Sequence, residues 1–291
     1  MRSLIEQELQ AELVETFKDP NYRPPALPTV ALQLSGLTRN DNAKIAYVVS
    51  LLERDAMLAG TVFRIVSSPL YASRVPITSL HQAVVRLGFK ALRSVVFEAV
   101  LQRGIFDLPD YRETVEQLRR HSTTAAYIAK VVSQECGVDE DSAFLGGLLH
   151  DIGFSGLLFS ISNQRQDASP RLATVWHDVD ETHERASMLV SRLWALPEEI
   201  CEIAGNHHHH ERCADEATRK AAAAVCVGDW MTERFGANVV GPLDDDGTLI
   251  AADRVAPECL AAARALLAID DERLQRIVEK AEAIVPEILW I

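Results

Sequence analysis

The sequence predicts an all-α protein. Three observations favour this class: apolar residues recur at three- and four-residue spacing over long stretches, only 14 glycines and 12 prolines occur in 291 residues, and no segment shows a convincing two-residue alternation of the kind typical of a strand. Hydrophobic residues make up 48% of the chain, which is enough for a sizeable core in one large domain or two small ones.

Short helices are expected in the first third of the chain. Residues 3–18 have the pattern of an amphipathic helix, and the prolines between positions 20 and 28 predict a linker after it. Several short helices should follow between 30 and about 108. Within this stretch Ser79 is a candidate N-cap for a helix that runs to Leu87 and is closed by Gly88, and a further helix should cover 91–101.

A long helix over about 111–135 should open the rest of the chain and end at Gly137. Further helices are expected at 140–150, 152–163, 170–177, 181–195, 197–208 and 216–235, and Pro197 suits the first turn of its helix. Residues 237–256 predict a loop or linker. Its run of three aspartates, 244–246, lacks the spacing and the distal Glu of a calcium-binding loop, so we interpret it as a solvated turn.

The tail, 257–291, should be helical again. One face of it is apolar, and the simplest interpretation is that this face packs on its own domain, although it would also suit a homodimer contact. The residues of this face are Leu274, Ile277, Val278, Ala281 and Ile284.

Composition excludes several classes of function. The net charge of −13 argues against direct binding of duplex DNA, which requires a basic surface. No membrane-spanning run is expected, and the acidic, amphipathic N-terminus does not resemble a signal peptide. The five cysteines have no CxxC spacing and predict reduced thiols in a cytoplasmic protein, with Cys226 packed in the core.

The pair His150-Asp151 is the most informative feature of the chain. It ends an apolar helix that contains Phe144, Leu145 and Leu148, so an imidazole and a carboxylate are brought to a core where both are costly to bury without partners. Together they offer a nitrogen and an oxygen ligand to a divalent metal ion. A single His-Asp pair is weak support, so the hypothesis depends on further ligands.

Five further residues are expected on inward helix faces or at helix ends. The helical spacing groups His121 with Leu118 and Ile128, and it groups Asp229 with Val225 and Cys226. The small residues Ala186 and Ser187 leave room beside His183, and His207 and His208 end the helix that begins at Pro197. The predicted ligand set is therefore His121, His150, Asp151, His183, His207, His208 and Asp229.

Taken singly, each of these residues has a simpler interpretation. A histidine on an apolar face is usually a core residue with its hydrogen bonds satisfied, a buried aspartate is usually a cap or an ion-pair partner, and the run 207–210 could be a solvated helix end. Five imidazoles and two carboxylates on inward faces are harder to explain in this way. They suffice for two ions of iron, manganese or zinc with positions open to water.

In this order the motifs resemble the HD superfamily, and the extra histidines are similar to those of HD-GYP phosphodiesterases. The upstream half is similar to the HDOD branch (HD-related output domain). The resemblance covers about residues 22–230 and rests on the order of these segments: Leu27-Pro28-Thr29-Val30, 52–58, Arg64-Ile65-Val66-Ser67-Ser68, 77–88 and Leu193-Trp194-Ala195-Leu196-Pro197 before His207-His208.

The resemblance implies an HD-type helical bundle with an N-terminal helical subdomain and a C-terminal helical extension. On this basis we expect a helix and linker over 1–21, an HDOD domain over 22–236 and a linker with helical extension over 237–291. The domain would divide into a helical part, 22–108, and a metal-site part, 109–236. Many HDOD domains have lost the metal ligands and act as signalling modules, and this chain resembles those that retain them.

Three departures from the HD-GYP pattern weaken cyclic-dinucleotide hydrolysis as the activity. Phe154 stands where those enzymes carry a phosphate-binding lysine, residues 211–216 hold no GYP motif, and Gln117 replaces a glutamate that supports a third metal in some relatives. Arg120 and Arg212 are candidates to replace the missing phosphate contacts.

Two functions therefore stay open for a bacterial signal-transduction protein. The first is a metal-dependent phosphohydrolase acting on a phosphate-containing small molecule, with His150, Asp151 and Asp229 holding the metals and Asp151 as the bridge. The second is a regulatory module that contacts a signalling partner protein, with a structural, sensory or vestigial metal site. A di-iron redox or gas-sensing centre is a third interpretation, which the absence of hemerythrin-like HxxxE spacing disfavours.

Overall fold

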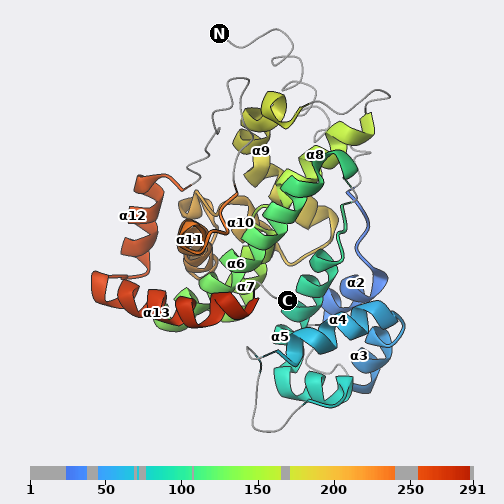
Figure 1. Cartoon of the computed structure of the whole chain (residues 1–291). Coiled ribbons are helices and arrows are strands. Elements are labelled where there is room, and N and C mark those ends of the chain that lie inside the picture. The colour runs from blue at the N-terminus through green and yellow to red at the C-terminus, as the bar shows by residue number, and fades with distance from the viewer. Residues whose placement is uncertain are drawn as a thin grey trace.

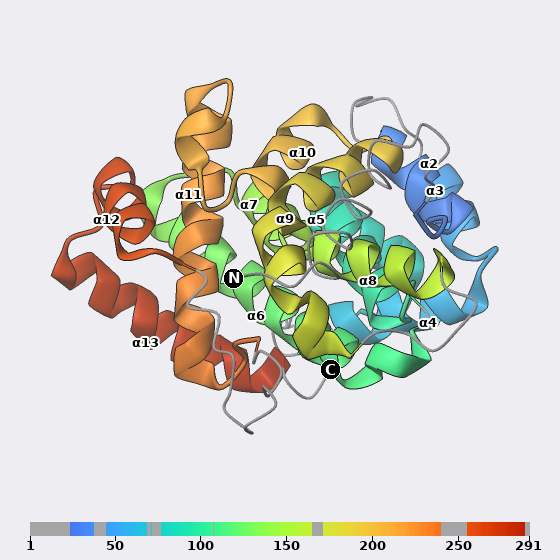
Figure 2. The same cartoon turned by 90° about the horizontal axis from the view of Figure 1, so that it is seen from above.

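The computed structural model describes residues 24–37, 45–68, 71, 77–106, 108–164, 171–239 and 255–288, and the regular structure within them is entirely helical. The expected helix at 3–18 and most of the loop at 237–256, including the aspartate run, lie outside the described residues. The α-helices form three groups along the chain (Figures 1 and 2).

The N-terminal group contains α2 (Thr29–Leu37), α3 (Ile45–Leu52), α4 (Ala56–Val66) and α5 (Leu80–Gln102), with α2, α3 and α4 packed against α5. The predicted cap is confirmed, because the Ser79 hydroxyl accepts a hydrogen bond from the Gln82 amide at 3.2 Å. The predicted stop at Gly88 is also confirmed: this residue has φ +71° and ψ 173°, so α5 is two helical segments joined at a kink.

The central group surrounds the predicted ligands. It consists of α6 (Arg112–Cys136), α7 (Glu140–Leu149), α8 (Ile152–Gln164), α9 (Leu172–Leu193), α10 (Glu198–Gly205) and α11 (Glu216–Met231). The helix α6 packs against α7 and α11, and α9 packs against α8 and α10. Short 3-10 turns, η2 (Pro109–Tyr111), η3 (His210–Arg212) and η4 (Thr232–Phe235), lie before α6 and on either side of α11.

Two predicted boundaries in this group are wrong. A break was expected between 177 and 181, but α9 is continuous, because Trp176, Val179 and His183 keep helical spacing on one buried face. The helix expected over 197–208 ends at Gly205, so His207 and His208 lie in the turn after it rather than on a helix.

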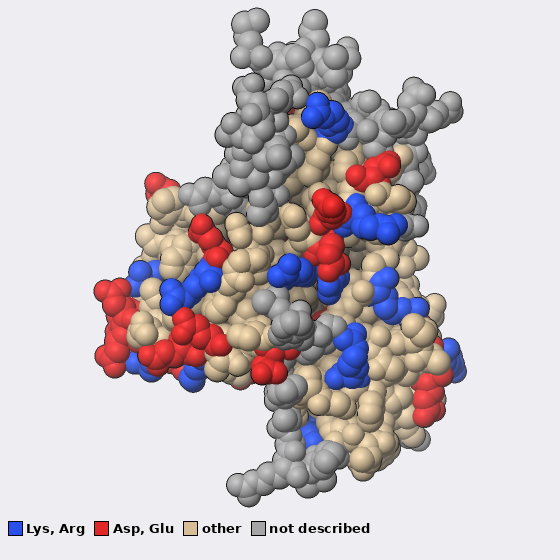
Figure 3. Space-filling model, in the orientation of Figure 1, with Lys and Arg blue, Asp and Glu red and all other residues tan. Residues whose placement is uncertain are grey.

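The C-terminal group, α12 (Pro257–Leu266) and α13 (Asp271–Ile288), lies on the opposite side of the central helices from α2–α5 in both views (Figures 1 and 2). The apolar face of α13 packs on α6, with Ile277 and Ala281 completely buried. Outside this contact, α12 and α13 carry mixed charges, including ion pairs from Arg264 to Asp271 and from Arg276 to Glu272 (Figure 3).

Residues Glu140–Ser162 are the one stretch of the described chain that is long and apolar enough to cross a membrane, but 94% of its 18-residue window is buried inside the protein. It includes α7, most of α8 and, between them, the candidate ligands His150 and Asp151. Its hydropathy therefore reflects the core of the bundle.

Candidate metal centre

All seven predicted ligands converge at one place in the central group. They come from α6 (His121), the end of α7 (His150 and Asp151), α9 (His183), the turn after α10 (His207 and His208) and α11 (Asp229). Six of them are at most 5% exposed, and the side chain of His208 is 11% exposed. Burying so many polar groups together is costly unless they bind one another or a shared ligand.

One cluster gathers His121, His150 and Asp229. The Nε2 atoms of His121 and His150 lie 3.1 Å apart, and Asp229 Oδ1 is 3.1 Å from His121 Nε2. Asp151 Oδ2 lies 3.3 Å from His121 Nε2 and 3.4 Å from His150 Nε2. These atoms are close enough together to surround a single ion.

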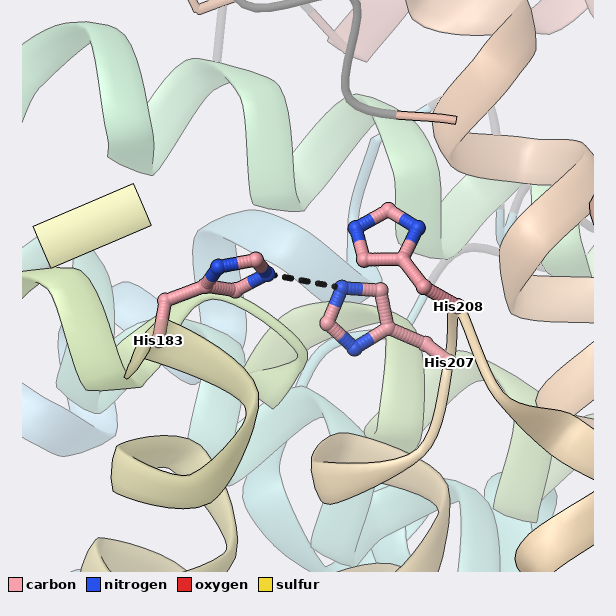
Figure 4. A group of neighbouring side chains, drawn as sticks. All are labelled: His183, His207 and His208. Atoms are coloured by element: carbon pink, nitrogen blue, oxygen red, sulfur yellow. Dashed lines mark hydrogen bonds between the residues drawn. The ribbon is translucent and has the colours of Figure 1, made fainter. Parts of the chain in front are cut away.

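A second cluster gathers His183, His207 and His208. The Nε2 atoms of His183 and His207 point toward each other from α9 and from the turn after α10, 3.3 Å apart, with the ring of His208 beside them (Figure 4). The rings of His207 and His208 are 4.1 Å apart between centroids. This group could also hold a metal ion.

The two carboxylates lie between the clusters. Asp151 Oδ2 faces the first cluster, while its Oδ1 is 3.7 Å from His183 Nε2 and 3.9 Å from His207 Nε2 in the second. Asp229 likewise has Oδ1 toward His121 and Oδ2 3.9 Å from His208 Nε2. Asp229 Oδ2 is buried and accepts no hydrogen bond from any described residue, as expected of an oxygen placed for a cation.

Backbone carbonyls fix four of the imidazoles. The Nδ1 of His150 donates to Gly147 O at 2.7 Å, that of His207 to Ala204 O at 3.0 Å, and that of His183 to Asp180 O. His121 Nδ1 is paired with Ala237 O at 3.1 Å. Because Nδ1 donates to a carbonyl in each case, Nε2 faces the centre, which is the arrangement found in histidine metal ligands.

The charges in the centre favour metal binding over an empty core. Burial lowers the pKa of His150 and holds that of His207 well below its ordinary value, so both are neutral ligands. For His121, burial is outweighed by Asp151 and Asp229, which raise its pKa to about 9. Burial would raise the pKa of Asp229, but the hydrogen bond and charge of His121 hold it well below normal. Without a metal, a proton on His121 therefore offsets part of the charge of the two carboxylates, and a cation bound there would displace it.

The Ser187 hydroxyl ties the ligand-bearing turn to α9. It donates to His150 O at 2.6 Å and accepts from the Gly153 amide at 2.9 Å. The close approach requires glycine at 153, because a Cβ there would lie 2.2 Å from His183 O and 2.5 Å from Ser187 N. Ser187, one of the small residues noted beside His183 in the sequence, is thus needed where α8 and α9 approach closely.

Phe154, three residues after Asp151, is where the HD-GYP resemblance led us to expect a lysine. It is completely buried, and its ring lies 4.8 Å from that of His183 and 5.5 Å from that of Trp176 between centroids. The side chain therefore packs against a candidate ligand and is inaccessible to a substrate.

The second cluster opens to the surface through a hollow of about 510 Å³, which contains His183 and His208. Five carboxylates and no lysine or arginine are among the described residues that line it; the acidic residues are Asp180, Glu181, Glu184, Glu211 and Glu258. Such an opening attracts divalent cations and opposes the entry of a free anion.

Several residues of the site were not singled out from the sequence. Glu184 accepts hydrogen bonds from the His208 amide at 2.9 Å and from His209 Nδ1 at 2.7 Å, and so holds the histidine turn against α9. Its position directly after His183 was the available signal. His210 is 4% exposed, although the run 207–210 left open a solvated end, and Cys259 reaches the rim of the hollow from α12.

Neither suggested arginine lies at the ligands. Arg120 is exposed on α6, and Arg212 lines a neighbouring hollow together with Arg185 and Arg192. Residue type alone identified these two arginines, but the direction of their side chains depends on the fold.

Comparison with known families gives a match to the HDOD domain over residues 25–210. The chain belongs to the HDOD family. The match ends before Asp229 and Ala237, so part of the ligand set of this HDOD protein and the carbonyl that orients His121 lie beyond the matched residues.

Solved structures share the fold of this HDOD chain. An HDOD domain protein of unknown function from Geobacter sulfurreducens has a TM-score of 0.66 at 24% identity, over 98% of this chain and 96% of the other. A candidate metal-dependent phosphohydrolase from Shewanella amazonensis SB2B has a TM-score of 0.63 at 18% identity, over 90% of this chain and 99% of the other. A candidate signal transduction protein from Marinobacter aquaeolei VT8 has a TM-score of 0.62 at 20% identity, over 98% and 64%.

Among curated proteins, an uncharacterized protein from Treponema pallidum (strain Nichols) is 22% identical over 226 residues. The match spans 74% of this chain and 43% of the relative, so the HDOD chain corresponds to less than half of that protein.

Proposed function

We propose that this HDOD protein binds two divalent metal ions at the seven ligands and hydrolyses a phosphate ester in a signalling process. The observation that carries the proposal is the position of Asp151, whose two carboxylate oxygens face different histidine clusters. A carboxylate that spans two groups of imidazoles is suited to bridge two cations. The fold shared with a candidate metal-dependent phosphohydrolase agrees with this activity.

The residues present fit such a centre. Four of the histidines are held with Nε2 toward the clusters, and the two carboxylates supply the negative charge that two cations require. Each cluster contributes three or four ligand atoms, which leaves positions for water and for phosphate oxygens. Two such ions supply Lewis acidity: they lower the pKa of a water molecule and neutralise charge on the phosphate.

The chemistry of the candidate ligands limits which metal ions suit the site. A set of five imidazoles and two carboxylates suits iron, manganese or zinc, whereas magnesium and calcium prefer sites made of oxygen. We therefore propose iron, manganese or zinc as the resident ions.

The test is metal content by elemental analysis, on protein purified without a nickel column because the exposed part of the histidine run would capture nickel. Wild-type protein should hold about two equivalents, and Asp151→Ala should lose both. His177→Ala is the matched control, because His177 is also on α9 but 66% exposed and paired with Glu181. Metal-free wild-type protein that takes up no added metal would overturn the proposal.

The activity is then tested on metal-loaded protein with phosphomonoesters, nucleotides and cyclic dinucleotides. Turnover that disappears in Asp151→Ala and survives in His177→Ala supports hydrolysis. Absence of turnover on all three substrate classes would contradict hydrolysis. The proposal that the site binds metal would be unaffected.

A regulatory role without turnover is the second candidate, and two observations favour it. Phe154 closes the position where related enzymes bind phosphate, and the opening beside His183 and His208 is lined by carboxylates. In that case the ions would stabilise or signal a conformation to a partner protein. Metal-dependent binding of a partner by protein that hydrolyses none of the phosphate esters would establish it.

A further inference from the structure

Two cysteines lie in contact beside the proposed metal centre. Cys226 is on α11, one turn before Asp229, and Cys259 is on α12. Their Sγ atoms are 3.2 Å apart, although 33 positions separate them in the sequence. Because a disulfide has a sulfur separation of about 2.05 Å, closing one here requires a movement on the order of an ångström.

Access differs between the two sulfurs. Cys226 is completely buried, whereas Cys259 is half-buried and lines the acidic hollow together with His183, His208 and His210. A small oxidant that enters the hollow therefore reaches Cys259 first and finds Cys226 directly behind it. A reactive thiol with a second thiol in reach is the arrangement of a peroxidatic and a resolving cysteine.

The other three thiols lack this arrangement. Cys201 Sγ contacts Leu196 O at 3.7 Å, and Cys213 Sγ contacts Glu202 O at 4.0 Å, so each faces a backbone carbonyl. Cys136 lies at the end of α6. These residues serve as internal controls for nonspecific oxidation.

We propose that Cys226 and Cys259 form a redox-active pair that closes a reversible disulfide between α11 and α12. The Cys259 thiolate attacks a hydroperoxide and cleaves its O–O bond, which gives a sulfenic acid and releases an alcohol or water. The Cys226 thiol then attacks the sulfenic sulfur and displaces water. In sum, two thiols and one hydroperoxide give one disulfide, one alcohol or water, and one water; two equivalents of a small thiol reverse the reaction.

The disulfide would fasten the C-terminal extension to the helix that carries Asp229. The contact at present consists of side-chain packing between α11 and α12. A covalent link there would hold the wall of the hollow beside His208 in place and restrict its opening. The redox state of the pair thereby controls access to the second cluster.

The test is titration of the 291-residue chain, after treatment with a chelator, with one to ten equivalents of hydrogen peroxide. Free thiols should fall from five to three, the intact mass should fall by that of two hydrogens, and peptide mapping should join the segments that contain Cys226 and Cys259. Dithiothreitol should restore all five thiols. The oxidised protein should melt at a higher temperature than the reduced protein.

Cys226→Ala separates the two steps. In this variant Cys259 should accumulate as a sulfenic acid that dimedone captures, whereas Cys201→Ser/Cys213→Ser should form the disulfide as the wild type does. Retention of five thiols in the wild type, or oxidation of Cys259 to a sulfinic acid while Cys226 stays a thiol, would overturn the proposal. These outcomes are measured on wild-type protein and hold even if a variant fails to fold.

Discussion

The ring of Phe154 packs against the imidazole of His183, with 4.8 Å between the ring centroids. An apolar side chain thereby supports one of the candidate metal ligands. The same contact stabilises the fold. Both side chains are buried, and shortening either one would leave a void.

Phe154→Ala should therefore lower the free energy of unfolding by about 3–5 kcal/mol. It should also weaken metal binding, because the ring that fixes His183 is lost. Urea unfolding and metal titration measure the two effects. Val85→Ala, at a position 56% exposed on α5, should change the free energy of unfolding by less than about 0.5 kcal/mol. A Phe154→Ala protein as stable as Val85→Ala would contradict this account of the contact.

Ser187→Ala should cost about 1–3 kcal/mol of stability, because it leaves His150 O and the Gly153 amide without their shared partner. Metal affinity should fall by about 10- to 100-fold, as for other residues that orient ligands. Ser191 is the matched control. It lies one turn further on α9, is equally buried, and its hydroxyl has no hydrogen-bond partner among the described residues. Equal metal affinities for the two variants would show that the Ser187 bridge is unimportant.

Gly153→Ala should destabilise the protein and reduce its metal content, because a Cβ at this position would lie 2.2 Å from His183 O. Gly60 in α4 provides the contrast, since a Cβ there meets nothing within 4 Å. Gly60→Ala should stabilise the helix by up to about 1 kcal/mol. Thermal unfolding compares the pair, and a neutral Gly153→Ala would mean that α8 and α9 lie further apart than described.

Metal removal should lower the melting temperature. At a free metal concentration 100 times the dissociation constant, one ion stabilises the folded state by about 2.7 kcal/mol, which corresponds to a shift of several degrees. Asp229→Asn should abolish most of the shift on addition of zinc or manganese. Asp271→Asn, at a fully exposed carboxylate, should keep it. A wild-type protein with identical melting curves with and without metal would argue against a bound ion.

Stability should also depend on pH through Glu98, whose carboxylate accepts a hydrogen bond from Tyr127 at 3.0 Å. Burial raises its pKa to about 7 from an ordinary value of 4.5, although the Tyr127 hydrogen bond opposes the change. The folded state thus favours the protonated group. Its contribution is complete below pH 4.5 and is lost as the pH rises through 7, by about 3 kcal/mol in total.

Glu98→Gln should therefore flatten the decrease in stability of metal-free protein between pH 5 and pH 8. Urea unfolding at four pH values in this range measures the slope. Replacing an exposed glutamate, Glu53→Gln, should leave the slope as it is in the wild type. If Glu98→Gln retains the full slope, other groups titrate in this range.

Much of the architecture was predictable because periodicity and capping are local properties. Ser79, Gly88 and Gly137 act where the sequence indicated, and Gly137 ends α6 with φ +68°. The seven candidate ligands were identifiable from the sequence as polar residues on apolar helix faces or at expected helix ends, and the structure brings them together. Their division into two clusters was not identifiable, because it depends on how α9 and the turn after α10 approach α7 in three dimensions.

The two wrong helix boundaries, in α9 and at the end of α10, also depend on contacts in three dimensions. A break was expected between 177 and 181, but Trp176, Val179 and His183 lie on one buried face, and their burial keeps α9 continuous. The short α10 ends early because the chain must turn to direct two consecutive histidines into one cluster. Neither effect is visible in a window of a few residues.

The backbone acceptors of the imidazoles also imply an order of assembly. His150, His183 and His207 each use a carbonyl three residues earlier, so each ligand is oriented as soon as its own helix has formed. His121 uses Ala237, 116 residues away, so its orientation waits until η4 has docked against α6. During folding the histidines of the second cluster should consequently be oriented before His121. A nascent chain that lacks residue 237 would then have only the second cluster arranged to bind an ion.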